Sequence, residues 1–306
     1  MGQERNSAAS SSGYVSGGGR RVAERPRYVT LPIMMVLAVI GYVYYVTVFG
    51  VIEDWLVLTT AAGLWNAVSF SSLAFMSLVT YVIAITRDPG RVPFSFTPDV
   101  EDSQVTLYEI KRKGGDLRYC QKCALYKPPR AHHCRVCKTC VLRMDHHCVW
   151  INNCVGHANY KVFFLFTLYT VAACFHSLAL LLGFVYDVHR GQIHNGGSVK
   201  ISHIICGLVV FPLCLALGVL LVWHIYLILQ NKTTIEHYEG VRATWIAKKA
   251  GNNYKHPYDL GIYENLISVL GPNIACWVWP TTSHIGSGTQ FLASHENKHP
   301  DRSLTS

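Results

Sequence analysis

Four long stretches without a charged residue constrain most strongly what this chain can fold into. They are residues 29–51, 60–85, 162–186 and 204–229. Each is long enough for a helix to cross the roughly 30 Å of bilayer hydrocarbon, which takes about 20 residues. Charged residues make up 15% of the chain, against roughly 25% in a soluble domain, and soluble chains rarely bury four such runs as core helices. The sequence therefore predicts an α-helical polytopic membrane protein with four transmembrane helices.

The basic residues predict how these helices are oriented. Five Lys/Arg lie in residues 1–28, thirteen in 86–161 and seven in 231–306, whereas the connections 52–59 and 187–203 hold none and two. Because short basic loops stay on the cytosolic side, we expect both termini and the loop between helices 2 and 3 to be cytosolic. The formal charge of +9 then suits anionic membrane lipids or a phosphorylated cosubstrate.

The chain divides into five regions on this basis. They are a cytosolic disordered N-terminal tail (1–28), transmembrane helices 1 and 2 (29–86), a cytosolic cysteine-rich domain (87–161), transmembrane helices 3 and 4 (162–229) and a cytosolic C-terminal region (230–306). Residues 98–113 are expected to form a linker or a short surface helix, residues 236–250 a helix, and residues 266–279 a segment at the membrane interface. We find no internal repeat.

Seven of the eleven cysteines lie between Cys120 and Cys154, with four histidines among them. The cytosol keeps thiols reduced, so this location favours metal binding or catalysis over disulfides. The spacing Cys-x2-Cys, typical of zinc ligands, begins at Cys120, at Cys134 and at Cys137. One tetrahedral zinc uses four ligands and two zincs use eight. Seven cysteines with one histidine give eight ligands, and so do six cysteines with two histidines. The count alone therefore does not show whether one cysteine remains free of metal.

Cys148 has the surroundings that a nucleophile requires. A cysteine nucleophile needs a nearby base, and the base needs an acceptor that orients it. Asp145 and His146 lie within three residues of Cys148, and no other cysteine in this region has an acidic residue so close. A purely structural zinc fold, with Cys148 as a ligand, is the alternative that the spacing leaves open.

The arrangement Cys-x2-Cys-x9-His-Cys-x2-Cys-x2-Cys-x4-Asp-His-His-Cys-x5-Cys resembles the cysteine-rich domain of DHHC protein S-acyltransferases, also called palmitoyltransferases. It runs from Cys120 to Cys154 without a gap. The flanking motifs are similar too: residues 88–90 read Asp-Pro-Gly, residues 233–236 read Thr-Thr-Ile-Glu, and residues 258–265 carry the C-terminal Tyr/Gly/Asn pattern. The similarity covers roughly residues 29–280 and is greatest to plant members.

The resemblance implies two structural zinc ions with interleaved ligands. The first would take Cys120, Cys123, His133 and Cys140, and the second Cys134, Cys137, His147 and Cys154. It also implies that Cys148 is the nucleophile, His146 the base and Asp145 the residue that orients the base, in acyl transfer from a fatty acyl-CoA to cysteines of proteins near the membrane. Val149 and His256 depart from the common pattern. The first affects no reacting atom, and the second slightly weakens the C-terminal alignment, though not at Asn265.

Further contacts are expected around this site. Four basic residues are candidates to bind the CoA phosphates: Arg118, Lys122, Lys127 and Arg130. Thr234 is expected to hydrogen-bond near Asp145, and Asn265 to tie the C-terminal region to the helices. Helix capping is the other interpretation of Thr233 and Thr234. The family also suggests residence in the Golgi or another endomembrane.

Three other classes of protein explain the sequence less well. A membrane-anchored zinc-binding module or ubiquitin ligase of the RING kind needs a final Cys-x2-Cys pair, which does not follow Cys140. A transporter or channel usually carries ionisable groups inside the membrane, where the spans offer only Asn66, His176 and His224. A nucleic-acid binder is disfavoured because the positive charge is spread through loops next to a membrane.

Overall fold

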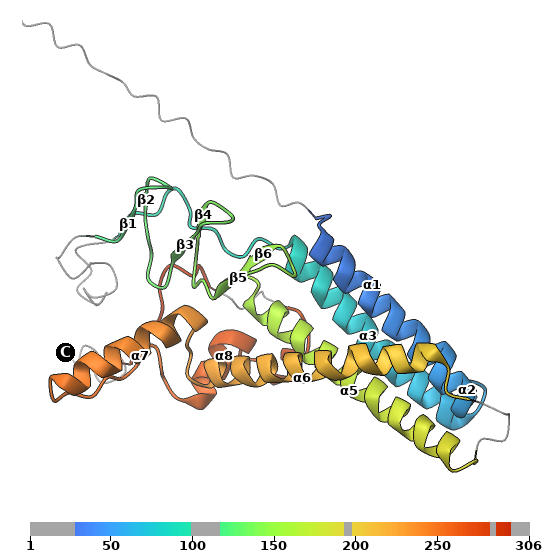
Figure 1. Ribbon diagram of the computed structural model, residues 1–306. Coiled ribbons are helices and arrows are strands. Elements are labelled where there is room, and N and C mark those ends of the chain that lie inside the picture. Colours follow the sequence, from blue (N-terminus) through green and yellow to red (C-terminus); the bar gives the residue numbers. More distant parts are fainter. Residues whose placement is uncertain (1–27, 99–116, 193–197, 282–285, 295–306) are drawn as a thin grey trace, which may run out of the picture.

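The computed structural model describes residues 28–98, 117–192, 198–281 and 286–294. In this part of the chain four helices are long and apolar enough to cross a membrane. They run side by side as a bundle, with the cysteine-rich domain at one end (Figure 1). The predicted fold class, a helical membrane protein with a cysteine-rich domain between the second and third helices, is confirmed. The expectations for residues 1–20 and for most of residues 98–113 lie outside the described residues.

The four spans agree with the four uncharged stretches. The first is continuous from α1 (Leu31–Tyr45) through the π-helical turn η1 (Val46–Ile52) to α2 (Glu53–Trp55), and the others are α3 (Ala61–Thr86), α5 (Tyr160–His189) and α6 (Ile201–Leu229). Helix α3 ends where Asp88-Pro89-Gly90 follows, as a Pro-Gly pair requires. Helix α5 is longer than its uncharged stretch at both ends, because Tyr160 and Lys161 are already helical and the helix continues to His189.

Polar pairs hold the helices together inside the bundle. The hydroxyl groups of Thr47 and Ser177 are 2.8 Å apart, and Ser77 hydrogen-bonds to Thr170 between α3 and α5. A buried hydroxyl without a partner is costly, so each pair fixes how its two helices face each other. The packing of α3 on α5 matters most for the site, because the cysteine-rich domain connects these two helices (Figure 1).

The described part of the cysteine-rich domain contains three short antiparallel hairpins. They are β1 (Tyr119–Cys120) with β2 (Leu125–Tyr126), β3 (His132–Cys134) with β4 (Thr139–Val141), and β5 (His146–Cys148) with β6 (Asn153–Val155). Strands of two or three residues cannot build a large apolar core, and domains of this kind usually depend on bound metal or disulfides. All cysteines are free thiols, which leaves metal as the means of holding these hairpins.

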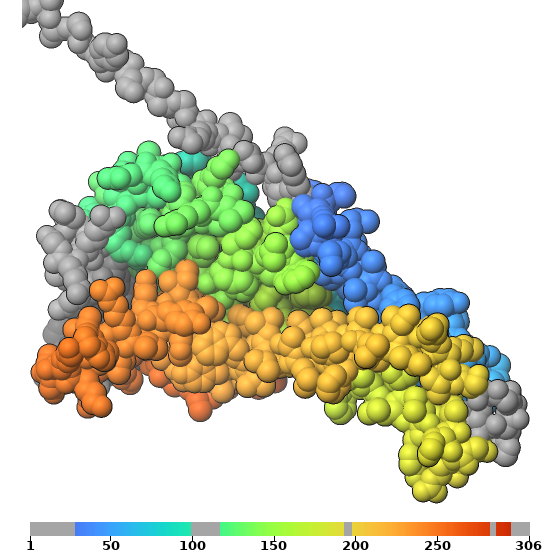
Figure 2. Space-filling model, viewed as in Figure 1, coloured from blue at the N-terminus to red at the C-terminus, as the bar shows by residue number. Residues whose placement is uncertain are grey.

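The C-terminal region packs against both the bundle and the hairpins. Helix α7 (Thr234–Lys249) confirms the helix expected near residues 236–250, and it lies along the edge of the cysteine-rich domain (Figure 2). The apolar run after Leu266 is not one segment. Helix α8 (Ile262–Leu270) stops at Gly271, whose φ is 99°, and the short 3₁₀ helix η2 (Ile274–Cys276) follows.

Candidate functional site

The three hairpins are copies of one unit with a period of 14 residues. The cross-strand pairs Tyr119↔Tyr126, His133↔Cys140 and His147↔Cys154 occupy the same place in successive hairpins. The turn residues Ala124, Lys138 and Asn152 are also 14 apart and share the left-handed conformation, with φ of 51°, 54° and 47°. Our expectation that the sequence contains no repeat was therefore wrong. The repeat is hidden because the units share only a few residues.

Neighbouring units build the first metal cluster together. Cys120 and Cys123 come from the turn of the first hairpin, and His133 and Cys140 face each other across the second. The Nδ1 atom of His133 lies 3.6 Å from Cys120 Sγ, 3.1 Å from Cys123 Sγ and 3.8 Å from Cys140 Sγ.

The second cluster repeats this arrangement one unit later. Cys134 and Cys137 come from the turn of the second hairpin, and His147 and Cys154 face each other across the third. His147 Nδ1 lies 3.7 Å from Cys134 Sγ, 3.4 Å from Cys137 Sγ and 3.7 Å from Cys154 Sγ. The structure thus brings together the same two sets of four residues that the resemblance implied.

The geometry of both clusters fits zinc. Within each cluster all ligand atoms lie within 4.8 Å of one another. With Zn–S bonds of about 2.3 Å, the corners of a tetrahedral site are roughly 3.7 Å apart, which is close to the separations in both clusters. Three cysteines and one histidine form a common ligand set of structural zinc. Each cluster supplies four protein ligands, so neither leaves a position for a substrate.

Cys148 belongs to neither cluster, and the repeat explains why. It takes the place of Cys120 and Cys134, as the first cysteine of a turn. The second cysteine of that turn is replaced by the buried Ile151. A fourth hairpin would have to supply the remaining ligands, but α5 begins at Tyr160 instead. The third site is therefore incomplete, and the Cys148 thiol belongs to no metal cluster.

Strand alternation separates catalytic from metal-binding candidates in β5. Side chains alternate between the two faces of a strand, so His147 faces its cluster while His146 and Cys148 share the other face. His146 Nδ1 is 2.7 Å from Asp145 Oδ2, and Cys148 is close enough to His146 to help raise the pKa of its imidazole. These three residues therefore form a connected line of carboxylate, imidazole and thiol.

Helix α7 fixes the carboxylate end of this line. Asp145 is 1% exposed, and it accepts hydrogen bonds from Thr234 N at 2.8 Å and Thr234 Oγ1 at 2.9 Å. Burial raises the pKa of Asp145, but the hydrogen bonds from His146 and Thr234 N, together with the charges of His146 and His224, outweigh burial, and the pKa lies below its usual range. Burial lowers the pKa of His146, but the hydrogen bond to Asp145 and the negative charges of Asp145 and Cys148 outweigh burial and raise the pKa to about 9.

The structure contains both the contact with Asp145 and the helix cap that we expected from Thr233 and Thr234. Thr234 contacts Asp145, as predicted. Thr233 is the N-cap of α7, because its hydroxyl accepts from Glu236 N while the Glu236 carboxylate accepts from Thr233 N. This reciprocal capping box sets where α7 begins and so where Thr234 lies.

The structure adds two residues from the membrane helices that the motif did not include. His224 of α6 lies with its ring centroid 6.1 Å from that of His146. Its Nδ1 is 2.9 Å from the hydroxyl of Tyr160 in α5, and both histidine rings meet Phe163 edge-on. The signal in the sequence was a histidine inside an otherwise apolar span, which we noted without assigning it to this site.

The third hairpin is fastened directly to α3. Asn153, which faces Cys148 across the hairpin, donates through Nδ2 to the carbonyls of Arg87 at 2.8 Å and Ala84 at 3.1 Å. The Tyr81 hydroxyl donates to the carbonyl of Trp150 at 2.8 Å. Cys148 also packs in one apolar cluster with Phe163 of α5. Cys148 therefore lies where the hairpin meets the membrane helices.

Arg130 has a different role from the CoA contact that we expected. It is 4% exposed, and its guanidinium binds both carboxylate oxygens of Glu236 at 2.6 Å and 2.8 Å. The guanidinium also stacks on the rings of Tyr258 and Phe291, 4.3 Å and 4.8 Å from their centroids. A buried and fully bonded arginine cannot receive a phosphate, so Arg130 instead ties the cysteine-rich domain to α7.

The other three basic candidates lie nearer the surface. Lys122 is exposed and Lys127 is half-buried. Arg118 is half-buried and donates to the carbonyls of Pro128 and Ala131.

Asn265 makes the link between the C-terminal region and the helices that we expected. Its Nδ2 donates to the carbonyl of Leu229 at the end of α6, at 2.8 Å.

Comparison with known proteins agrees with these motifs. Residues 113–241 match the DHHC palmitoyltransferase family. The chain is 57% identical to probable protein S-acyltransferase 16 of Arabidopsis thaliana over 90% of its own length and 96% of the relative. It is 48% identical to probable protein S-acyltransferase 15 of the same plant, over 84% and 100%. It is 31% identical to palmitoyltransferase ZDHHC15A of Danio rerio, over 86% and 84%. The chain therefore belongs to the DHHC palmitoyltransferase family, as a member similar to those of plants.

Proposed function

We propose that this protein is an S-acyltransferase that moves a fatty acyl group from acyl-CoA to cysteine thiols of proteins, through an acyl thioester on Cys148. The observation that carries this proposal is the free Cys148 thiol beside His146 and Asp145. A purely structural zinc fold has no need of a cysteine outside both clusters, two residues from a histidine whose Nδ1 is held by a buried carboxylate.

The first step is attack of Cys148 Sγ on the thioester carbon of the acyl-CoA. His146 takes the proton of the Cys148 thiol, and Asp145 holds its Nδ1–H so that the other ring nitrogen faces the sulfur. A tetrahedral intermediate forms. It collapses as the bond to the CoA sulfur breaks, and His146 returns the proton to that sulfur. The products are free CoA and S-acylated Cys148.

The second step transfers the acyl group to the protein substrate. The substrate thiol attacks the acyl carbon on Cys148 while His146 accepts its proton. The bond from Cys148 Sγ to the acyl carbon then breaks, and the proton passes from His146 to Cys148 Sγ. The enzyme returns to its starting state, and the substrate carries the thioester.

The two metal clusters support this chemistry without taking part in it. Zinc bound there would hold the hairpins in place, through Cys120, Cys123, His133 and Cys140 and through Cys134, Cys137, His147 and Cys154. His147 and Cys154 belong to the third hairpin. The cluster that contains them therefore fixes the strand that carries His146 and Cys148.

The position of Cys148 suits a lipid substrate. It shares an apolar cluster with side chains of the membrane helices, and each methylene of an acyl chain buried there gains about 0.8 kcal/mol. Lys122 and Lys127 remain candidates to bind the CoA phosphates, and Arg118 is a weaker one because its guanidinium already donates to two carbonyls. The bias of basic residues supports a cytosolic location for this end of the bundle and for both termini. We assign the five regions accordingly and infer residence in the Golgi or another endomembrane.

Labelling with a palmitoyl-CoA analogue that carries an alkyne tests the proposal. Wild-type protein should acquire a label that hydroxylamine removes, because hydroxylamine cleaves thioesters. Cys148→Ser and Cys148→Ala should lose that label, whereas Cys276→Ser, which changes a cysteine outside both clusters, should keep it. Equal hydroxylamine-sensitive labelling in all four proteins would contradict the assignment of Cys148.

A further inference from the structure

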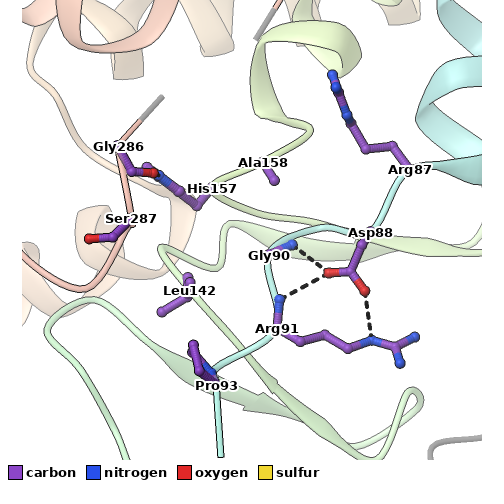
Figure 3. Close-up of a pocket in the computed structure, with 10 residues that line it drawn as sticks. All are labelled: Arg87, Asp88, Gly90, Arg91, Pro93, Leu142, His157, Ala158, Gly286 and Ser287. Carbon is purple, nitrogen blue, oxygen red and sulfur yellow. Dashed lines mark hydrogen bonds and ion pairs between the residues drawn. The ribbon is translucent and has the colours of Figure 1, made fainter. Parts of the chain in front are cut away.

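A cavity of about 380 Å³ is lined by the ten residues drawn in Figure 3. None of them belongs to a metal cluster or to the Asp145–His146–Cys148 group. Four chain segments meet around it: the turn that follows α3, Leu142 just after β4, the loop between β6 and α5, and the short C-terminal stretch at Gly286–Ser287. Two arginines, Arg87 and Arg91, are among its lining residues.

The cavity lies at the level where the bilayer hydrocarbon ends. Helix α3 ends at Thr86, one residue before Arg87, and α5 begins at Tyr160, two residues after Ala158 of the cavity wall. Both helices are candidate spans. The headgroup region extends roughly 5–7 Å beyond the hydrocarbon on each side. Residues this close to the ends of two spans therefore lie among lipid headgroups.

The acidic residue in the cavity does not cancel its positive charge. Asp88 Oδ1 accepts from the backbone N–H groups of Gly90 and Arg91 at 2.9 Å and 3.0 Å, and its Oδ2 accepts from Arg91 Nε at 3.0 Å (Figure 3). Arg91 is thus held through Nε, and within the described part of the chain its two terminal amino groups have no partner and can take another ligand. The guanidinium of Arg87 has no hydrogen-bond partner among the described residues.

The backbone around the cavity is fixed before any ligand arrives. Asn153 holds the carbonyl of Arg87, and Ala158 N donates to the carbonyl of Pro89 at 3.1 Å. Gly90 turns the chain at φ 95°, and a Cβ atom there would lie 3.4 Å from Ala158 N. The two arginines therefore extend from an anchored turn. The backbone of such a site loses little conformational entropy when a ligand binds, so the ordering cost falls on the arginine side chains.

We propose that this cavity binds the phosphate of an anionic phospholipid headgroup. Guanidinium groups form paired, charge-assisted hydrogen bonds with phosphate oxygens, and lipid phosphates occupy the level at which the cavity lies. A phosphate without an attached cation fits best, because the choline of a zwitterionic lipid would bring a positive charge to the two arginines. Free CoA carries the same phosphate chemistry, and the experiment must separate these two sources.

The test measures lipid retention by native mass spectrometry, which does not depend on acyl transfer. Full-length wild type, Arg87→Gln, Arg91→Gln and the double variant are released from nanodiscs containing equal amounts of phosphatidic acid and phosphatidylcholine. Arg242→Gln on α7, an exposed site outside the cavity, is the matched control. Melting temperatures in pure phosphatidylcholine establish that every variant is folded.

We expect wild type and Arg242→Gln to retain phosphatidic acid in preference to phosphatidylcholine. Each cavity substitution should lower that preference roughly five-fold. The proposal is overturned if the folded double variant keeps the wild-type preference, or if wild type shows none. It is also overturned if free CoA displaces the bound lipid from wild type but not from the double variant, since the cavity would then be a CoA site. Failure of the Cys148 labelling test would leave these outcomes unchanged.

Discussion

At the scale of single residues, Cys134 and Cys148 show how the same side chain acquires two chemistries. They occupy equivalent places in hairpins 14 residues apart. Cys134 has Cys137 three residues later and joins a metal cluster, whereas Cys148 has Ile151 there and joins none. The histidines differ in the same way, because alternation along β5 turns His147 to a cluster and His146 to Cys148. Neighbouring positions, more than residue type, decide which thiol is free.

Metal content should distinguish the two cysteines. Cys134→Ser removes one ligand of a four-ligand cluster, so we expect it to lower bound zinc by about one ion per chain and to lower the melting temperature. Cys148→Ser should keep the wild-type zinc content, because Cys148 lies outside both clusters. Elemental analysis of purified protein measures both. Loss of zinc in Cys148→Ser would favour the purely structural alternative.

Restoring the missing cysteine of the third turn should impair the nucleophile. Ile151→Cys would create a third Cys-x2-Cys turn that can chelate a soft metal ion. We expect its acyl labelling to fall in added zinc and to recover when a mild chelator is supplied. Ile151→Ala empties the same buried position without adding a ligand and serves as the control. Equal sensitivity of the two variants to zinc would contradict the relation between the third turn and a metal site.

At the scale of elements, α7 joins the cysteine-rich domain to the end of the bundle. Its first turn carries the cap Thr233, the Asp145 contact Thr234 and the partner of Arg130, Glu236. Burial raises the pKa of Glu236, but the charge of Arg130 and its hydrogen bonds outweigh burial and lower the pKa from 4.5 to about 2. The ionised carboxylate therefore stabilises the folded state.

Replacing this carboxylate should destabilise the folded protein. Glu236→Gln leaves Arg130 buried without a counter-charge, which costs about 3 kcal/mol, whereas Glu239→Gln on the exposed side of α7 should change little. Because the folded pKa is depressed, the contribution is present above pH 4.5 and is lost as the pH falls toward 2. The gap in melting temperature between wild type and Glu236→Gln should narrow over that range. A gap that stays constant with pH would contradict this account.

The elements were predictable to different degrees, for physical reasons. The spans followed from the absence of charge, since hydrocarbon excludes it. The pairing of ligands did not follow from spacing, because spacing does not say which hairpins share an ion; the resemblance supplied that division. The place of Arg130 was not readable either. A basic residue beside a motif can face solvent or a buried partner, and Glu236 lies 106 residues further along the chain.

At the scale of the whole molecule, the C-terminal region holds the ends of the helices together. Lys161, in the first turn of α5, is buried and donates to the carbonyls of Leu270 at 2.9 Å and Cys276 at 2.8 Å. Those carbonyls lie at the end of α8 and in η2. A buried ammonium needs such acceptors, so the lysine fixes the C-terminal segment against α5, next to the third hairpin.

Asn265 makes the corresponding link to α6, and its loss should loosen the C-terminal region while sparing the metal clusters. It is fully buried, donates to the Leu229 carbonyl and to Asp259 Oδ1, and accepts from Leu260 N. Asn265→Leu leaves these groups unsatisfied, at a cost of about 1–3 kcal/mol each. We expect faster proteolysis after Lys249 and weaker acyl labelling, with unchanged zinc. Asn252→Leu, at an exposed position near the end of α7, is the control. Zinc loss as large as in Cys134→Ser would mean that Asn265 supports the whole fold, and wild-type proteolysis would mean that this link is dispensable.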